Sequence, residues 1–306
     1  MVVLRRVVIV LVGLAMLALL ALWVITGPQS IPANALPAHT PNLVNGEELF
    51  NAGGCASCHA KPDGDRTQLS GGRALESPFG TFYVPNISSD PKDGIGNWTE
   101  AQFLTAMLKG TGPDGQHLYP SFPYASYQRM RVDDVRDLFA YLKTLPAVQG
   151  RVQDHDLPFP FNIRLALGPW KLLFLDGKPF QPDPSKSTEW NRGSYLVNGP
   201  GHCAECHSPR NLLGGLDETK RFAGGPNPEG EGWVPNITQK SLASWSEQDF
   251  ADFLESGDTP DFNSVGGSMR PVIQNLSHLT PEDRKAMAVY LKSLSPIDSP
   301  PIPAVK

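Results

Sequence analysis

The 306-residue sequence contains one unit twice. Three short motifs occur in both halves: CASCH at 55–59 and CAECH at 203–207, VPNI at 84–87 and 234–237, and YLK at 141–143 and 290–292. Equivalent positions are separated by about 150 residues in every case, and a nearly constant shift indicates duplication into tandem domains rather than a solenoid. We therefore expect two domains, over 43–148 and 189–297, with a linker over 149–188.

Each copy has the pattern of a mainly α-helical domain. Thr99 and Ser246 precede apolar residues at helical spacing and are typical N-caps. Gly110 and Gly257 stand where these two helices should end. Asp133 brings similar cap chemistry to the start of the last helical block in the first copy. Strand patterns are scarce, so the expected fold class is mainly α.

Residues 1–27 contain an apolar segment of membrane-spanning length. Arg5 and Arg6 precede about 20 residues without a charge, which at 1.5 Å per helical residue cross the roughly 30 Å hydrocarbon layer. A cleaved signal peptide, the alternative, usually has a shorter apolar core and a small-residue cleavage site. The positive-inside rule keeps the arginines in the cytoplasm. The sequence therefore predicts a single-pass anchor in a bacterial inner membrane, with the remaining chain in the periplasm.

The linker 149–188 contains a second, shorter apolar run over 163–175. It holds Arg164, Lys171 and Pro169, and it is too short to span a bilayer. We expect it to pack between or across the two domains, with docking to a membrane surface or a partner as the alternative. The net charge of -5 argues against nucleic acid as a partner, because phosphate binding needs a basic surface.

The two CxxCH motifs predict attachment of haem c. The thiols of Cys55 and Cys58, and of Cys203 and Cys206, have the spacing that forms thioethers with the two haem vinyl groups, and the following histidine is adjacent for the iron. A zinc site would need four ligands, which would join motifs that belong to separate repeats. A thioredoxin-like pair would need a βαβ context. His59 and His207 are therefore the predicted proximal iron ligands of two covalently attached haems.

Residues 43–297 resemble the dihaem c-type cytochrome subunits that accompany bacterial membrane-bound and periplasmic dehydrogenases, of the alcohol, gluconate and molybdenum hydroxylase types. The motifs that carry the resemblance are the two CxxCH sites, VPNI with a following tryptophan, HLYPSFPYASY at 117–127 and GGSMRPVIQNLSHLTPEDRKAMAVYL at 266–291. The resemblance implies two class I cytochrome c domains with one haem each. It also implies an electron carrier rather than an enzyme, with a dehydrogenase as donor and a quinone, terminal oxidase or other cytochrome as acceptor.

The resemblance also implies a methionine above each iron. Met269 stands in a Gly-Gly-Ser loop before the last helix, where the family places this ligand. The equivalent position in the first copy is Phe122, which cannot bind iron. We expect Met130 to take this place. The alternatives are His117, Met107 on an apolar helical stripe, and an open or water-bound iron.

An open first haem would favour a different function class. The rival prediction is a dihaem enzyme, peroxidase-like or thiol-oxidising, and a haem-based gas sensor would use the same open position. Asn86 and Asn236 of the VPNI motifs, together with Arg73, are expected to hydrogen-bond either haem propionates or neighbouring backbone. The sequence shows no pattern in which a catalytic nucleophile is paired with a base.

Overall fold

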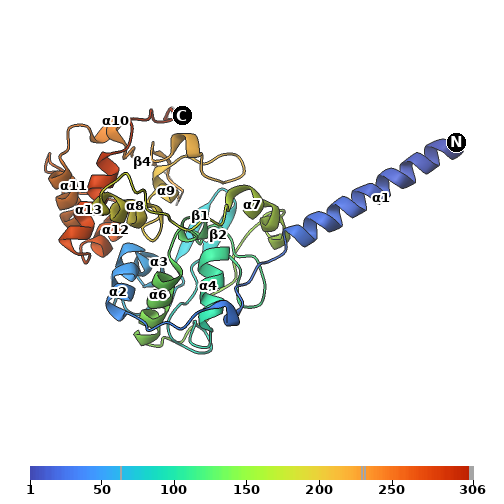
Figure 1. Ribbon diagram of the computed structural model, residues 1–306, viewed down its shortest axis with the longest axis horizontal. Coiled ribbons are helices and arrows are strands. Elements are labelled where there is room, and N and C mark those ends of the chain that lie inside the picture. Colours follow the sequence, from blue (N-terminus) through green and yellow to red (C-terminus); the bar gives the residue numbers. More distant parts are fainter. Residues whose placement is uncertain (63, 229, 231, 303–306) are drawn as a thin grey trace.

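The computed structural model describes residues 1–62, 64–228, 230 and 232–302. Helix α1 (Val2–Ile25) extends away from a body of short helices and loops (Figure 1). None of its residues is buried, and it is long and apolar enough to cross a membrane. The predicted mainly helical architecture behind an N-terminal apolar helix is confirmed.

The first repeat follows a short 3-10 helix, η1 (Ala33–Ala35). Its elements in chain order are α2 (Leu43–Ala52), α3 (Cys55–His59), β1 (Ala74–Ser77), β2 (Gly80–Tyr83), α4 (Glu100–Lys109), α5 (Tyr124–Tyr127) and α6 (Val132–Thr144). The two strands form an antiparallel hairpin in which Ala74 faces Tyr83.

The second repeat has the same order of elements with small additions. They are α8 (Thr188–Asn198), α9 (Ala204–His207), η3 (Glu218–Lys220), β3 (Gly225–Pro226), β4 (Trp233–Val234), α10 (Gln239–Leu242), α11 (Glu247–Ser256), α12 (Met269–Leu276) and α13 (Pro281–Lys292). Strands β3 and β4 also pair antiparallel.

In each repeat the first and last helices cross at a glycine. A Cβ built on Gly46 of α2 would lie 2.3 Å from the Asp137 carbonyl oxygen of α6. A Cβ on Gly193 of α8 would lie 1.8 Å from the Ala286 carbonyl oxygen of α13. Real Cβ atoms do not approach backbone this closely, so both crossings depend on glycine.

The predicted helix ends are confirmed, with one correction. Thr99 and Ser246 form capping boxes at the starts of α4 and α11, and Gly110 and Gly257 end these helices in the left-handed conformation. In the last helix of the first repeat, however, the N-cap position is occupied by Arg131, which makes no side-chain cap hydrogen bond, and Asp133 lies in the first turn. The Asp133 carboxylate there faces the positive end of the helix dipole.

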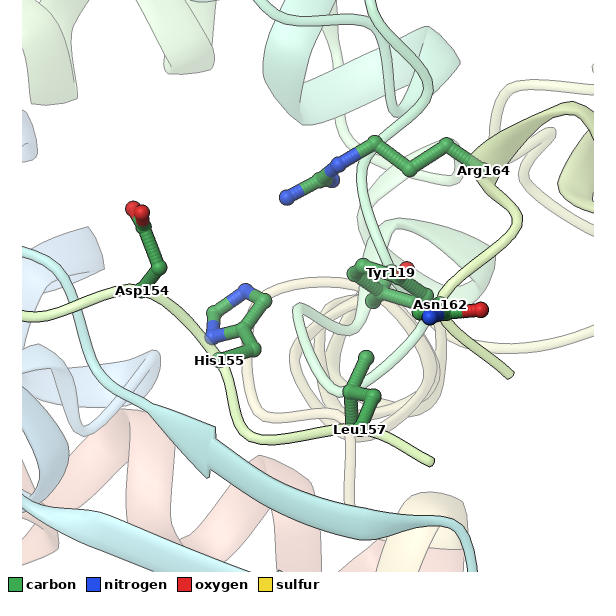
Figure 2. Close-up of a pocket in the computed structure, with 6 residues that line it drawn as sticks. All are labelled: Tyr119, Asp154, His155, Leu157, Asn162 and Arg164. Atoms are coloured by element: carbon green, nitrogen blue, oxygen red, sulfur yellow. The ribbon is translucent and has the colours of Figure 1, made fainter. Parts of the chain in front are cut away.

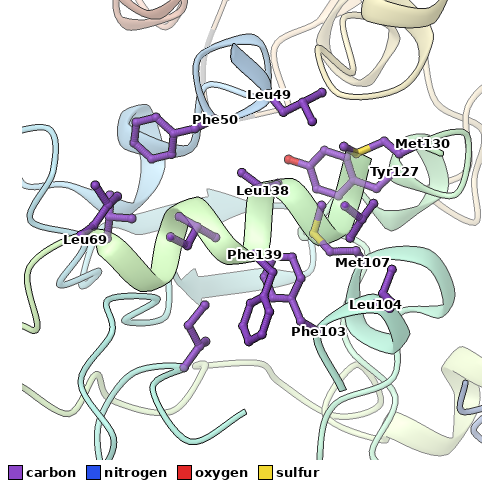
Figure 3. Close-up of a cluster of buried hydrophobic side chains, with 14 of the residues drawn as sticks. Leu49, Phe50, Leu69, Phe103, Leu104, Met107, Tyr127, Met130, Leu138 and Phe139 are labelled. Carbon is purple, nitrogen blue, oxygen red and sulfur yellow. The ribbon is translucent and has the colours of Figure 1, made fainter. Parts of the chain in front are cut away.

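Each repeat has its own hydrophobic core. In the first, α2, α4 and α6 bury Leu49, Leu104 and Leu138 with a group of aromatic side chains (Figure 3). In the second, Leu196, Phe250 and residues of α13 do the same.

The segment between the repeats contacts both of them. It contains η2 (Arg164–Ala166) and α7 (Leu167–Phe174). The Lys171 Nζ donates to the Lys109 carbonyl oxygen of the first repeat at 2.9 Å. The Trp170 Nε1 donates to the Leu213 carbonyl oxygen of the second repeat at 2.9 Å. The apolar run thus packs across the two repeats.

Candidate functional site

The two CxxCH motifs form the short helices α3 and α9. Cys55 is the first residue of α3, after Gly54 in the left-handed conformation, and Cys203 caps α9. All four cysteines are half-buried thiols. Burial raises the pKa of Cys55 to about 12 and that of Cys203 to about 11. Within the described residues, no group of three or more His, Cys, Asp and Glu gathers as a metal site.

Both predicted iron-binding histidines bond to the proline of a VPNI motif. The His59 Nδ1 lies 2.8 Å from the Pro85 carbonyl oxygen, and the His207 Nδ1 lies 2.8 Å from the Pro235 carbonyl oxygen. Burial lowers the pKa of both, that of His59 to about 4. A neutral imidazole that donates through Nδ1 keeps the Nε2 lone pair available for a metal.

In each repeat one glycine holds the histidine close to the proline of its VPNI motif, and the two glycines are equivalent. The Gly71 N–H donates to the His59 carbonyl oxygen at 2.7 Å, and the Gly224 N–H donates to the His207 carbonyl oxygen at 2.8 Å. Both glycines have positive φ, and a Cβ on either would lie within 2.6 Å of the carbonyl of the residue before the proline. Sequence reasoning missed this role for the prolines, although the recurrence of VPNI signalled it.

The asparagines of VPNI bond to neighbouring backbone. The Asn86 Nδ2 donates to the carbonyl oxygens of Val148 and Gly150, and the Asn236 Nδ2 donates to that of Ile297. Each side chain thereby ties the VPNI loop to the chain that follows the last helix of its repeat. The Arg73 Nη1 donates to the Ser57 carbonyl oxygen of α3 at 2.8 Å.

The methionine candidates differ in their surroundings. Met130 is 1% exposed and lies in the first core with Tyr127 and with Met107 of α4 (Figure 3). Phe122 packs against the same core. Met269 is half-buried at the edge of the second core. The sequence predicts a loop at Met269, but the structure makes it the first residue of helix α12.

His117 occupies a different environment from Met130. It is buried, and its carbonyl oxygen accepts from the Arg164 Nη1 at 2.9 Å. Burial, together with the charge of Lys171, lowers its pKa to about 4, while a hydrogen bond with the Thr26 backbone acts in the opposite direction. These contacts connect His117 to the anchor end and the linker.

The two CxxCH helices lie at the interface between the repeats. The Ser57 Oγ of α3 donates to the Pro271 carbonyl oxygen of α12 and accepts from the Asn275 Nδ2 at 2.7 Å. The His202 Nε2, just before α9, lies 3.2 Å from the Gly53 carbonyl oxygen, just before α3.

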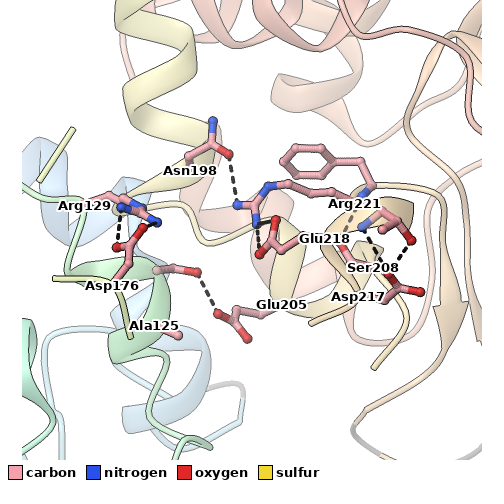
Figure 4. Close-up of polar contacts among 12 residues, drawn as sticks. Ala125, Arg129, Asp176, Asn198, Glu205, Ser208, Asp217, Glu218 and Arg221 are labelled. Atoms are coloured by element: carbon pink, nitrogen blue, oxygen red, sulfur yellow. Dashed lines mark hydrogen bonds and ion pairs between the residues drawn. The ribbon is translucent and has the colours of Figure 1, made fainter. Parts of the chain in front are cut away.

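The reciprocal contacts, from the first repeat to the CxxCH helix of the second, connect α5 to α9. The Ser126 Oγ donates to the buried Glu205 carboxylate at 2.7 Å, and the Tyr127 ring meets the His202 ring edge-on. Figure 4 shows Glu205 directed toward the segment at Ala125, and Arg129 facing Asp176 of the linker. Each repeat therefore packs the segment before its last helix against the CxxCH helix of the other.

A pocket of about 350 Å³ is lined by residues outside these helices (Figure 2). It is lined by Tyr119, Asp154, His155, Leu157, Asn162 and Arg164. None of these residues belongs to a CxxCH motif or to either of the two large cores.

Comparison with known proteins identifies both repeats. The cytochrome c family pattern matches residues 43–146 and 190–295. The chain is 50% identical over 280 residues to a protein of Cereibacter sphaeroides named "Diheme cytochrome c-type", and the match covers 90% of this chain and 94% of that protein.

Other relatives are named as subunits of dehydrogenases. The chain is 40% identical to a nicotinate dehydrogenase subunit of Pseudomonas putida, over 82% of this chain and 21% of that protein. It is 38% identical to the fructose dehydrogenase cytochrome subunit of Gluconobacter japonicus, over 88% of this chain and 56% of that protein. The chain thus spans about half or less of these two relatives. It belongs to the cytochrome c family, and its two cytochrome c domains each carry one covalently bound haem c.

Proposed function

We propose that this chain is a membrane-anchored periplasmic dihaem cytochrome that transfers electrons from a partner dehydrogenase to the respiratory chain. Haem c, when bound, supplies a one-electron redox couple. The observation that carries the proposal is the meeting of the two CxxCH helices at one interface, with the Gly53 carbonyl oxygen 3.2 Å from the His202 Nε2. This contact brings the two attachment sites together within one protein.

The partners and the location in the cell belong to the same proposal. The fructose dehydrogenase relative is named as a cytochrome subunit, and the nicotinate relative is named as a dehydrogenase subunit, which supports a dehydrogenase as donor. A quinone, a terminal oxidase or another cytochrome would be the acceptor. Helix α1 supports an inner-membrane anchor by its length and composition.

We also propose the domain boundaries 43–148 and 189–297, with the linker over 149–188. The side-chain amides of Asn86 and Asn236 support the two carboxyl-terminal limits, because they bond to the carbonyl oxygens of Val148 and Ile297. Helix α8 begins at Thr188, one residue before the proposed start of the second domain.

The chain's own residues prepare each site for its iron. Cys55 and Cys58 attach the first haem and Cys203 and Cys206 the second. Four further residues would bind the iron in this proposal: His59 and Met130 in the first domain, His207 and Met269 in the second. The carbonyl oxygens of Pro85 and Pro235 fix the histidine tautomer and ring orientation, which makes the imidazole a stronger donor. The burial of Met130 excludes water from its surroundings.

The carbon monoxide response of the reduced protein tests the methionine ligands. If both irons have two protein ligands, the dithionite-reduced chain should not bind carbon monoxide, and its haem absorbance should not change. Met130→Ala and Met269→Ala should each open one haem, so that about half of the haem absorbance shifts on addition of the gas. Met107→Ala is the matched control, because Met107 is also a buried methionine of the first core but should leave both irons closed.

The same measurement tests the rival function. Phe122, which stands at the place equivalent to Met269, favours an open first haem and a peroxidase-like or thiol-oxidising enzyme. If the unmodified chain binds about one carbon monoxide per two haems, the Met130 assignment is wrong and the enzyme becomes the better proposal. If Met107→Ala opens an iron and Met130→Ala does not, Met107 is the ligand.

The proline contact of the second haem should tune its potential. In Gly224→Ala the new Cβ would lie 2.6 Å from the Val234 carbonyl oxygen, so the loop must move and the bond from the His207 Nδ1 to Pro235 should weaken. A less basic imidazole stabilises the ferric iron less, which raises the reduction potential. A redox titration should show one of the two potentials rising.

Gly13→Ala is the control for this variant, because Gly13 lies in α1, away from both CxxCH helices, and a Cβ there meets no described atom within 4 Å. A Gly224→Ala chain whose two potentials both match those of the parent would refute the tuning role of Pro235.

A further inference from the structure

A group of leucines near the linker helix α7 is exposed. We call it the leucine surface, and each member is at least 60% exposed: Leu165, Leu172, Leu173, Leu212 and Leu213. The first three come from the linker, and the last two come from a turn of the second domain. An exposed apolar patch of this kind marks an interaction site more often than a chance surface.

Direct contacts join the two parts of the leucine surface. The Trp170 Nε1 of α7 donates to the Leu213 carbonyl oxygen at 2.9 Å. A Cβ built on Gly215 would lie 2.3 Å from the ring of Phe174 at the end of α7. The turn over 211–215 therefore lies directly against α7, which places its two exposed leucines next to the helix that carries Leu172 and Leu173.

The leucine surface adjoins the end of the membrane anchor. A Cβ built on Gly168 of α7 would lie 2.4 Å from the Thr26 carbonyl oxygen, and Thr26 immediately follows α1. Figure 1 shows α7 at the base of α1. A 24-residue helix is about 36 Å long and exceeds the roughly 30 Å hydrocarbon core. In a bilayer that α1 spans, its end, and α7 with it, would lie at the level of the lipid headgroups.

The linker presents no outward charge over residues 165–175. Lys171 is the one charged residue of this stretch. Its Nζ turns inward and donates to the carbonyl oxygens of Lys109 and Gly110. Exposed leucines next to a membrane anchor, on a linker segment that carries no outward charge, favour insertion into the boundary between headgroups and acyl chains.

We propose that the leucine surface inserts into the outer boundary of the same bilayer that α1 spans, as a second membrane contact of this chain. The occupant of the surface is lipid. The inference rests on the proposed anchoring by α1. With two contacts to the bilayer, the haem domains would have a fixed orientation relative to the membrane. A helix of eight residues cannot span the bilayer, so the contact is interfacial.

Quenching of a fluorescent label by brominated lipid tests this contact. All four native cysteines form thioethers in the haem-loaded chain, so a single introduced cysteine takes a bimane label. Full-length Leu172→Cys and Leu212→Cys chains are placed in vesicles of brominated or ordinary phosphatidylcholine. Their emission should fall about twofold or more in the brominated vesicles, because the label lies among the acyl chains.

Two further positions make the result decisive. Val44→Cys is the matched control, because Val44 is an exposed apolar residue of α2, and Figure 1 shows α2 on the side of the body away from α1. Its emission should not change. Trp23→Cys reports on the insertion of α1 itself. The haem content of each variant shows that it is folded.

If the labels at 172 and 212 respond like the label at 44 while the label at 23 is quenched, the second contact is wrong and the anchor stands. The leucine surface would then be left to a protein partner. If the label at 23 is not quenched either, the proposed anchoring is wrong, and the inference falls with it.

Discussion

A chain with Cys203→Ala and Cys206→Ala is expected to retain one covalent haem and lose the other. Haem c is held through its two thioethers, and each CxxCH helix belongs to one domain with its own core. Removal of both thiols from α9 leaves the second haem without covalent attachment. The haem-to-protein ratio, measured on the denatured protein, should fall from two to one, and the mass should fall by one haem.

The reciprocal variant, Cys55→Ala with Cys58→Ala, is the control and should retain the second haem instead. The remaining haem should still show the spectrum of a closed iron in each case. A ratio that stays at two in either double variant would contradict the assignment of these cysteines. Comparison of the two single-haem proteins also separates the two reduction potentials.

Replacement of Gly193 by alanine should strongly destabilise the second domain. The new Cβ would lie 1.8 Å from the Ala286 carbonyl oxygen, and backbone on both sides of the crossing cannot rotate away. Overpacking in a core costs typically about 1–3 kcal/mol, and more when main chain must separate. For a domain of about 100 residues, each kcal/mol lowers the melting temperature by about 4–8 °C.

Thermal unfolding followed by circular dichroism and by the haem absorbance would measure this change. Gly266→Ala provides the control, since its Cβ would meet nothing within 4 Å. Gly46→Ala should produce the corresponding effect in the first domain. If the melting temperature of the Gly193→Ala chain equals that of the control, α8 and α13 do not cross as described.

The sequence predicted the features that depend on local chemistry. The repeat, the CxxCH sites and the caps at Thr99 and Ser246 follow from residue type and spacing, and they need no knowledge of distant contacts. The cap of α6 was missed because an aspartate is favourable both before a helix and within its first turn. Helix α12 was missed because Gly266 and Gly267 precede it and Pro271 lies within it.

The features that depend on distant contacts were not predictable. The hydrogen bond from the His59 Nδ1 to Pro85 joins residues 26 positions apart. The recurrence of VPNI marks the proline as important, but nothing in the motif shows that its carbonyl oxygen accepts from the histidine. The contact of Ser57 with Pro271 spans the two domains. The sequence shows two copies of one unit, but no pattern in it indicates which surfaces of the two domains pack against each other.

The reciprocal packing of α5 on α9 and of α12 on α3 has a consequence for the origin of the chain. Helices α5 and α12 occupy equivalent places in the two copies, so the same patch serves both sides of the contact, as in the isologous interface of a two-fold homodimer. A single-haem ancestor with this patch would pair with its own copy. The present chain has the arrangement that fusion of such a dimer would give, with 149–188 connecting the two halves. In a fused chain each half can carry its own residues, such as phenylalanine at 122 and methionine at 269.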